Sequence, residues 1–496
     1  MKSIFLSRFI ALSVSAGFIC LLACSQTQRP GNHASTDPAA RNDSIMRRFN
    51  PADAARKAAK IDTFFQIMHR RYGFNGAVLI AQHGRVIYKG AFGYANLQTK
   101  DTLSSQTPFQ LASVSKQFTA VAIMQMEEKG LLKYDDPIYR YFPGFPYDSS
   151  ITVRTLLTHR SGLPNYIYTL EKYVDRSRPM SNREVVDKLF LYKPKAYGPP
   201  NQRFSYNNTN YALLAALVER LSGKSFREYA EENLFRPLGM SNTFINDGTD
   251  NRVVSAATGY TGSRRSLRLD YLDGVTGDKG VYSTVEDLFK WDRGLYTDKI
   301  IGQNTLQEAF MPAHDDANLL TKNYGFGWRL QKLPDNQWLT FHTGWWHGFK
   351  NYFMRNLQDQ TTIILLSNVA NSYMSKVGVL QAILYPTRAN YFMRRDVVPT
   401  EMAETPGGTT APQQGEAEFD LTEFSKMAWA KPLVAVRKVK NRGRNTRSHV
   451  STRAGRGHKA VVSKRKAVVS KRAVVSKRKV TKSKTTKSKS AKKGRR

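Results

Sequence analysis

The chain has 496 residues, a formal net charge of +37 and 41% hydrophobic residues, which is ordinary for a globular protein of one large domain or two. The charge is uneven, because residues 431–496 hold 26 Lys and Arg and no acid, which leaves +11 to everything before them. The two cysteines, Cys20 and Cys24, both lie near the N-terminus. Their position excludes a disulfide framework and a cysteine-based metal site from the body of the protein.

The N-terminus has the pattern of an export signal. Lys2 and Arg8 form a positively charged n-region before an apolar run over residues 9–22, which is too short for a membrane span. The run ends in Leu-Leu-Ala-Cys24, which resembles a bacterial lipobox; the alternative is an ordinary signal peptide with an incidental cysteine. We predict a signal peptide at residues 1–24, lipidation of Cys24 and a flexible linker at 25–51. The protein is then exported and lipid-anchored to the bacterial cell envelope, on its periplasmic or surface face.

The middle of the chain predicts an α/β (α+β) domain over residues 52–395. Its periodicity predicts the following elements in chain order: a helix at 52–72, strands at 76–80 and 85–91, a helix at 114–129, a long loop at 164–200, helices at 211–221 and 226–234, strands at 338–343, 349–355 and 361–368, and a helix at 372–384. The simplest assembly is an antiparallel sheet made from both ends of the domain and flanked by helices, with a mostly helical region inserted between them.

The C-terminal part changes composition. Residues 396–430 predict a linker, and residues 431–496 a disordered basic tail that repeats Ala-Val-Val-Ser-Lys-Arg three times. Such a tail binds polyanions by releasing counterions. The export signal favours envelope polyanions such as anionic glycans or lipid heads over nucleic acid, and a solvated appendage with no dedicated partner stays as an alternative.

Ser113 and Lys116 form a Ser-x-x-Lys pattern at the start of a predicted helix, where positions i and i+3 share a face. A serine hydroxyl needs a base to become a nucleophile, and a lysine can serve only if its pKa is lowered. The pattern alone is weak, because the tail contains three chance matches to it.

The surroundings of this pair carry a resemblance. Residues 109–119 (Phe-Gln-Leu-Ala-Ser-Val-Ser-Lys-Gln-Phe-Thr) resemble the first active-site box of the serine β-lactamase-related family, which includes class C β-lactamases, D-Ala-D-Ala peptidases and esterases. Tyr206-Asn207-Asn208 resembles its second box, Tyr-x-Asn, and His342-Thr343-Gly344 its third. The resemblance spans about residues 61–384 and implies a β-lactamase/transpeptidase-like fold.

The resemblance also implies roles. Ser113 would form an acyl-enzyme, while Lys116 and Tyr206 would take its proton and return one to the leaving group. For binding, Asn208 would contact Lys116 or a substrate amide, and His342, Thr343 and Gly344 would line the substrate strand and bind a carboxylate. The N–H groups of Ser113 and Trp345 would form the oxyanion hole.

Other residues keep simpler interpretations. His159 is interpreted as a structural residue of its loop, and Trp345, Trp346 and His347 either line the pocket or cover the sheet. The scattered histidines show no metal spacing, so we predict no metal and no cofactor.

The third box bears on the substrate. His342 stands where β-lactamases usually have Lys, and an imidazole is a weaker carboxylate anchor. The sequence also shows no acid clearly placed as a deacylating base. We therefore expect a D-Ala-D-Ala-type peptidase or an esterase, acting on a peptide or ester such as a peptidoglycan fragment. A β-lactamase is the alternative, and a penicillin-binding or polyanion-binding protein without turnover is the alternative of another class.

Overall fold

The structure is a computed structural model that describes residues 38–313, 323–371 and 373–393. The predicted signal peptide with Cys24, the linker at 396–430 and the tail at 431–496 lie outside the described residues. The chain divides into two units, Met1–Glu416 and Ala417–Arg496, and the second is wholly outside the described part. None of the described helices combines the length and apolar character that a membrane span requires.

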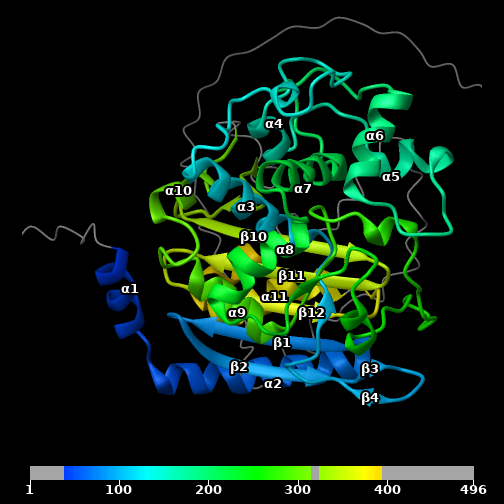
Figure 1. Cartoon of the computed structure of the whole chain (residues 1–496). Coiled ribbons are helices and arrows are strands. Elements are labelled where there is room, and N and C mark those ends of the chain that lie inside the picture. Colours follow the sequence, from blue (N-terminus) through cyan, green and yellow to red (C-terminus); the bar gives the residue numbers. More distant parts are fainter. Residues whose placement is uncertain (1–37, 314–322, 372, 394–496) are drawn as a thin grey trace, which may run out of the picture. The chain divides into compact units, whose positions relative to one another are not determined.

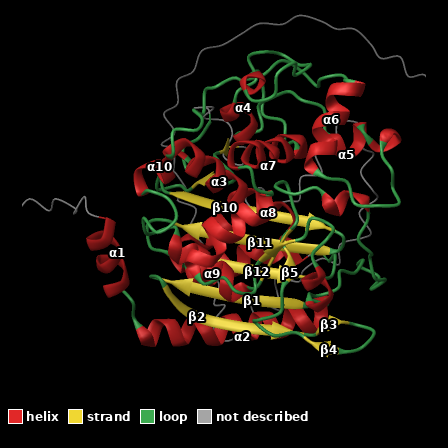
Figure 2. Cartoon of the chain, viewed as in Figure 1, coloured by secondary structure: helices red, strands yellow, loops and turns green. Residues whose placement is uncertain are grey.

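A seven-stranded antiparallel sheet lies at the centre of the domain (Figures 1 and 2). Its order is β2-β1-β12-β11-β10-β9-β8. The strands are β1 Gly76–Gln82, β2 Arg85–Phe92, β8 Asn323–Tyr324, β9 Arg329–Lys332, β10 Trp338–Trp346, β11 Phe349–Asn356 and β12 Thr361–Ser367. Because β1 pairs with β12, with Ala77 opposite Leu366, both ends of the domain build one sheet. The predicted fold class is confirmed.

The two faces of the sheet belong to different cores. Along the fully buried β1, Ala77 and Leu79 join the main core with the helical region, while Val78 and Ile80 point to the opposite face. Helices α2 (Pro51–Tyr72) and α11 (Val377–Leu384) contact each other, and their buried residues are not part of that main core. They therefore cover the second face, followed in the chain by the short α12 (Ala389–Phe392).

The inserted region, in cyan and green in Figure 1, lies partly above the sheet and partly, with α8 and α9, in front of it. It contains α3 Lys116–Glu128, α4 Val153–Leu157, α5 Tyr166–Thr169, α6 Asn182–Tyr192, α7 Asn208–Ser222, α8 Phe226–Ala230, α9 Val285–Gly294 and α10 Gln303–Glu308. Small sheets add β3 (Tyr94–Asn96) with β4 (Asp101–Thr102), and β5 (Phe109–Gln110) with β7 (Val281–Ser283) and β6 (Phe244–Ile245). Packing of α3 against α7 brings the first and second boxes together.

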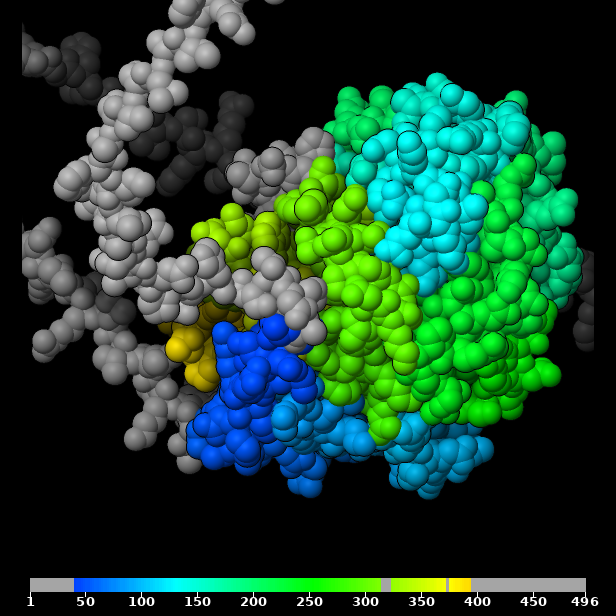
Figure 3. Space-filling view, turned by 60° about the vertical axis from the view of Figure 1, so that its left-hand side comes forward, coloured from blue at the N-terminus to red at the C-terminus, as the bar shows by residue number. Residues whose placement is uncertain are grey.

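Several elements differ from the sequence prediction. The predicted loop at 164–200 contains α5 and α6, and α6 begins at a capping box in which Ser181 and Glu184 bond reciprocally. The predicted helix at 114–129 starts as a 3-10 turn, Ala112–Ser115, before α3. In the predicted linker, Pro38–Arg47 forms helix α1. Asn42 fastens α1 by donating to the Tyr296 carbonyl at 2.8 Å, and Figure 3 shows this dark blue segment beside the yellow-green segment around residue 300.

Candidate active site

Ser113 is the exposed point of a buried segment. Every residue from 111 to 126 is buried except Ser113, which is half-buried. The 3-10 turn that carries it follows β5, and Ala112 enters the turn with a left-handed φ of 50°, a conformation that costs energy for a residue with a Cβ. The turn therefore holds one hydroxyl out of the core, as a nucleophile requires.

Gly344 lets β10 approach this turn closely. A Cβ at Gly344 would lie 2.2 Å from the Leu111 carbonyl oxygen, which leaves no room for a side chain. The third box thus lies directly against the segment that carries Ser113.

Lys116 is fully buried and has three polar partners. Its Nζ lies 3.1 Å from Ser113 Oγ, 2.8 Å from Asn208 Oδ1 and 2.8 Å from the Asp278 carbonyl oxygen. Burial is the main cause that lowers its pKa to about 7; Asp278 opposes the change and Arg329 adds to it. Near neutral pH a large fraction of Lys116 is therefore an uncharged amine.

Those contacts also aim the amine. An uncharged amine has two N–H groups and one lone pair, and Asn208 and the Asp278 carbonyl accept two N–H bonds. The lone pair is then left for the Ser113 hydroxyl. The structure brings together Ser113, Lys116 and Asn208, with Asn208 contacting the lysine rather than standing free.

Tyr206 packs over Lys116, with its ring centroid 4.9 Å from Nζ. Burial raises the pKa of its hydroxyl, and Ser113 and Arg329 partly offset this. The hydroxyl is close enough to Ser113 for that effect, yet it forms no well-directed hydrogen bond within the described part of the chain. A buried hydroxyl without a partner is costly, so it is ready to bond to an incoming group.

His159 packs against the ring of Tyr206. It is fully buried in a left-handed conformation, its ring lies 4.3 Å from that of Tyr206, and its Nδ1 accepts from the Asn207 N–H at 3.1 Å. Burial, with Lys116 and His342 nearby, holds its pKa well below the ordinary value. These contacts agree with a structural residue of its loop.

His342 is buried rather than presented to a substrate, with 1% of its surface exposed. Nδ1 lies 2.6 Å from the Thr343 carbonyl and Nε2 lies 2.8 Å from the Tyr324 hydroxyl. The carbonyl can only accept, so Nδ1 carries the proton and Nε2 accepts from Tyr324. Burial, then Arg329 and Lys116, holds the pKa of His342 far below its ordinary value. The predicted contact of this ring with a substrate carboxylate is revised, because a buried neutral ring with both nitrogens engaged offers no anchor.

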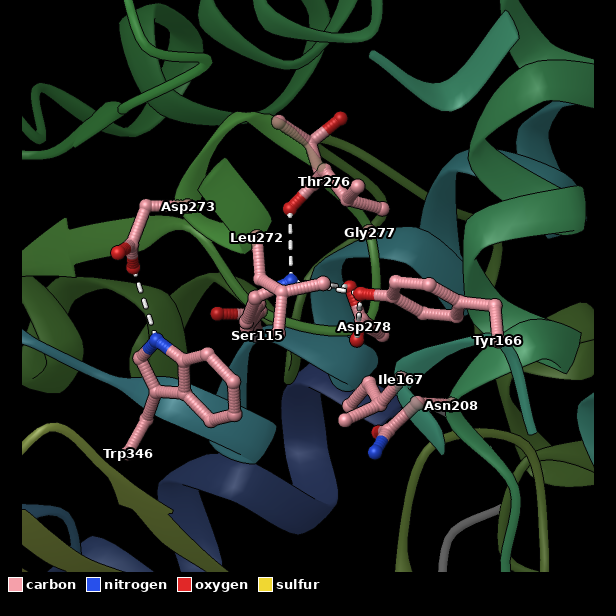
Figure 4. A network of polar contacts seen from close by, with 12 residues as sticks. Ser115, Tyr166, Ile167, Asn208, Leu272, Asp273, Thr276, Gly277, Asp278 and Trp346 are labelled. Carbon is pink, nitrogen blue, oxygen red and sulfur yellow. Dashed lines mark hydrogen bonds and ion pairs between the residues drawn. The ribbon is translucent and has the colours of Figure 1, made fainter. Parts of the chain in front are cut away.

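The rest of β10 differs in exposure. Thr343 is half-buried, the Trp345 ring is 54% exposed, and Trp346 turns inward to donate from Nε1 to Asp273 Oδ1 at 2.8 Å (Figure 4). The centroid of the Trp345 ring lies 5.5 Å from Nζ of Lys350, its neighbour on β11, so it extends along the sheet surface with one side open to solvent.

Arg329 is a site residue that sequence reasoning missed. It lies on β9 opposite Phe341, next to His342, and its guanidinium carbon is 5.3 Å from the centroid of the Tyr206 ring. Within the described residues no carboxylate pairs with it. The sequence prediction contains no strand at residues 329–332, so it could not place residue 329 beside the third box.

One cluster of possible metal ligands occurs within the described residues. Ligand atoms of Asp270, Asp273 and His347 all lie within 4.8 Å of one another. The Asp273 carboxylate already accepts from Trp346 and from the Asp270 N–H, and with Asp270 it raises the pKa of His347 against the effect of burial. An ion pair accounts for this cluster, and the absence of a metal stays a prediction.

Comparison with known proteins agrees with this geometry. The sequence model of the family described as Beta-lactamase matches residues 60–384. Penicillin-binding protein 4* of Bacillus subtilis (strain 168) is 35% identical over 340 residues, which cover 66% of this chain and 75% of that protein.

Two solved structures share the fold. The octameric penicillin-binding protein homologue from Pyrococcus abyssi is 24% identical with a TM-score of 0.57, over 66% of this chain and 77% of that one. The D-amino acid amidase from Ochrobactrum anthropi SV3 is 23% identical with a TM-score of 0.53, over 70% and 98%. Together with the family match and the Bacillus relative, the assembled boxes lead to one conclusion: this chain belongs to the β-lactamase family, the serine hydrolases to which penicillin-binding protein homologues are related.

Proposed function

We propose that the protein hydrolyses acyl substrates through an acyl-enzyme on Ser113, as a peptidase of the D-Ala-D-Ala type. The observation that carries this proposal is the Lys116 amine, 3.1 Å from Ser113 Oγ and fixed by two further acceptors. With a pKa of about 7, this amine can accept a proton at neutral pH.

The first step follows from that arrangement. As Ser113 Oγ attacks the acyl carbonyl, its proton moves to Lys116 and the carbonyl oxygen becomes an oxyanion. The N–H groups of Ser113 and Trp345 are the proposed donors to that oxyanion. When the tetrahedral species collapses, the bond to the leaving group breaks and the leaving amine takes a proton.

Tyr206 fits the proton transfer to the leaving group. Its hydroxyl is buried without a well-directed partner and lies near Ser113, and its ring packs over Lys116 Nζ. It can donate its proton to the leaving amine and recover one from Lys116, so the phenol needs no lasting charge. Water then attacks the ester on Ser113 by the same route in reverse, which releases the acid and restores the serine.

Arg329 favours a substrate with a free carboxylate over a neutral ester. His342 is neutral and buried, so Arg329 is the permanent cation beside the Tyr206 ring that can bind a terminal carboxylate, with the Thr343 hydroxyl. The names of the relatives, which include penicillin-binding proteins and a D-amino acid amidase, support the same substrate class.

The test is a substrate panel with two variants. Native protein should be labelled by fluorescent penicillin and should cleave D-Ala-D-Ala peptides, whereas Ser113→Ala should do neither. Arg329→Gln should raise KM for the peptide about tenfold or more relative to KM for a p-nitrophenyl ester, because only the peptide has a carboxylate, whereas an effect through the pKa of Lys116 acts on both substrates. Ester cleavage with no peptide cleavage would make the protein an esterase. Identical labelling of native and Ser113→Ala protein would contradict the proposal of an acyl-enzyme on Ser113.

A dedicated β-lactamase is less well supported. The Asp278 carboxylate accepts from the Tyr166 hydroxyl at 3.0 Å and lies 3.5 Å from Lys279 Nζ, so it is not free to activate water. We expect penicillin to acylate Ser113 and to leave slowly, and a chromogenic cephalosporin should give a burst with little steady turnover. Permanent labelling without turnover of any substrate would instead favour the binding-only alternative.

We propose that this activity takes place at the cell envelope. The support is the sequence of the first 24 residues, with lipidation of Cys24 as the anchor, and the basic segment at 431–496 as a contact to envelope polyanions.

A further inference from the structure

A second buried lysine lies behind Lys116. Lys279 is 3% exposed, and its Nζ donates to the Tyr166 hydroxyl at 2.7 Å and to the Val275 carbonyl at 3.2 Å. Nζ also lies 5.2 Å from the ring centroid of Trp346. The proposed reaction gives this lysine no task, although a buried ammonium is expensive to hold.

Asp278 joins the two lysines. Its carboxylate accepts from the Tyr166 hydroxyl (Figure 4) and also faces Lys279. Its carbonyl oxygen accepts from Lys116. Tyr166 therefore bonds to both members of the buried pair: it donates to the aspartate and accepts from the lysine.

The backbone around Asp278 is shaped for this contact. Gly277 has a φ of +92°, and a Cβ there would lie 2.6 Å from the Tyr211 carbonyl oxygen and 2.5 Å from the Ala215 Cβ on α7. The loop can thus run tight against α7, which brings the Asp278 carbonyl within reach of Lys116.

We propose that the Asp278–Lys279 pair, held by Tyr166, is a positioning device that sets how readily Lys116 exists as a free amine. The Asp278 charge raises the pKa of Lys116 against the effect of burial. Burial lowers the pKa of Lys279; Asp278 and Asp273 oppose this and the Lys116 charge adds to it, so each of the two lysines disfavours the charge of the other. The pair therefore places the Asp278 carbonyl oxygen as an acceptor for Lys116. The Lys279 charge offsets part of the stabilisation that the Asp278 carboxylate would give to the Lys116 ammonium. This inference rests on the proposed function of Lys116 as the base.

The other groups around Lys116 are the background against which the pair acts. Arg329 on β9 is charged and disfavours the ammonium. Tyr206, His159, Tyr211 on α7 and His342 on β10 are held neutral by burial. The Asp273 charge acts on Lys279 and opposes the effect of its burial. None of these changes its charge in the variants below.

The experiment compares Asp278→Asn, Lys279→Met and the double variant in the full chain. The readout is the acid limb of the pH profile for acylation of Ser113 by fluorescent penicillin. Lys279→Met should move the midpoint up by about one pH unit, and Asp278→Asn should move it down by about one, since each removes one nearby charge of opposite sign. The double variant should return close to the native midpoint. Lys224→Met, which removes a surface lysine paired with Glu232, is the matched control and should leave the profile unchanged.

A second measurement separates this inference from the proposed function. The ε-carbon resonance of Lys116 in ¹³C-lysine-labelled protein, assigned by its loss in Lys116→Met, reports the same titration without any substrate. If native protein is not acylated, the proposed function fails, but opposite shifts of this resonance would still support the pair's effect on Lys116. Shifts in the same direction, or none in protein with native near-ultraviolet circular dichroism, would overturn the inference. If Lys279→Met does not fold, Lys279→Gln takes its place with the same expected direction.

Discussion

The buried lysine predicts that the active site lowers the stability of the fold, and Lys116→Met tests this. Burial lowers the pKa of Lys116 from its ordinary 10.5 to about 7. Since each unit of that difference corresponds to about 1.4 kcal/mol, the ionised lysine costs on the order of 5 kcal/mol in the folded state. Below pH 7 the lysine is protonated in both states and the whole cost applies. Between pH 7 and 10.5 the unfolded chain keeps a proton that the folded chain has lost, so stability rises with pH.

The change with pH in the stability difference between native protein and Lys116→Met isolates the charge of Lys116, whereas the difference at a single pH does not. Methionine removes the charge but leaves Asn208 and the Asp278 carbonyl without their donor, at about 1 kcal/mol or more each. That loss is nearly independent of pH and cancels when one variant is followed across pH.

Urea unfolding of native protein and of Lys116→Met at pH 7 and pH 9 measures the effect. Native protein should gain about 2 to 3 kcal/mol relative to the variant over this interval. Lys224→Met, whose side chain is 47% exposed, should show a constant difference. A constant difference for Lys116→Met as well would refute the assignment of a buried, neutralised lysine.

Four further changes have defined outcomes. Gly344→Ala places a Cβ against the Leu111 carbonyl and should lower kcat about a hundredfold or more with a smaller effect on stability; near-native kcat in a crystal-verified variant would contradict the close approach. Asn208→Ala removes one acceptor that aims the Lys116 amine, so kcat should fall while KM changes little, and an unchanged kcat would count against that role. Cys24→Ala should abolish incorporation of labelled palmitate and release the protein from membranes, and continued incorporation would exclude the lipobox. Deletion of residues 431–496 should leave penicillin labelling intact but weaken salt-sensitive adsorption to anionic vesicles. Unchanged adsorption would contradict the proposal that this segment binds polyanions.

The sequence predicted five of the seven strands of the sheet from their local hydrophobic pattern, and it missed the short β8 and β9. The alternation and apolar runs in residues 76–91 and 338–368 identify strands without knowledge of their partners. Helix α6 was missed although its Ser181–Glu184 capping box is visible in the sequence, because the flanking Tyr and Pro residues suggested a loop. A local signal was present there and was outweighed by composition.

The site also contains residues that local motifs predict and residues whose positions depend on distant parts of the chain. Ser113 and Tyr206 were identified from short motifs, because each motif keeps its residues a few positions apart. The burial of His342 and the position of Arg329 depend on which strands meet and on what covers them. The contact of Asp278 with Lys116 joins residues 162 positions apart and uses a backbone carbonyl, which every residue has. The sequence therefore could not predict this contact.

Several features of the site lower the stability of the fold, and their occurrence together argues for catalysis over binding alone. Lys116 is buried, the Tyr206 hydroxyl lacks a well-directed partner, and Ala112 has a left-handed backbone. Each feature lowers stability, and each has a use in the proposed reaction: a free amine, a proton donor and an exposed nucleophile. A protein that only bound polyanions through a basic segment would need none of them, and Met in place of Lys116 would relieve the largest cost. The unfavourable features occur together at one hydroxyl, which is the expectation for a site built to react.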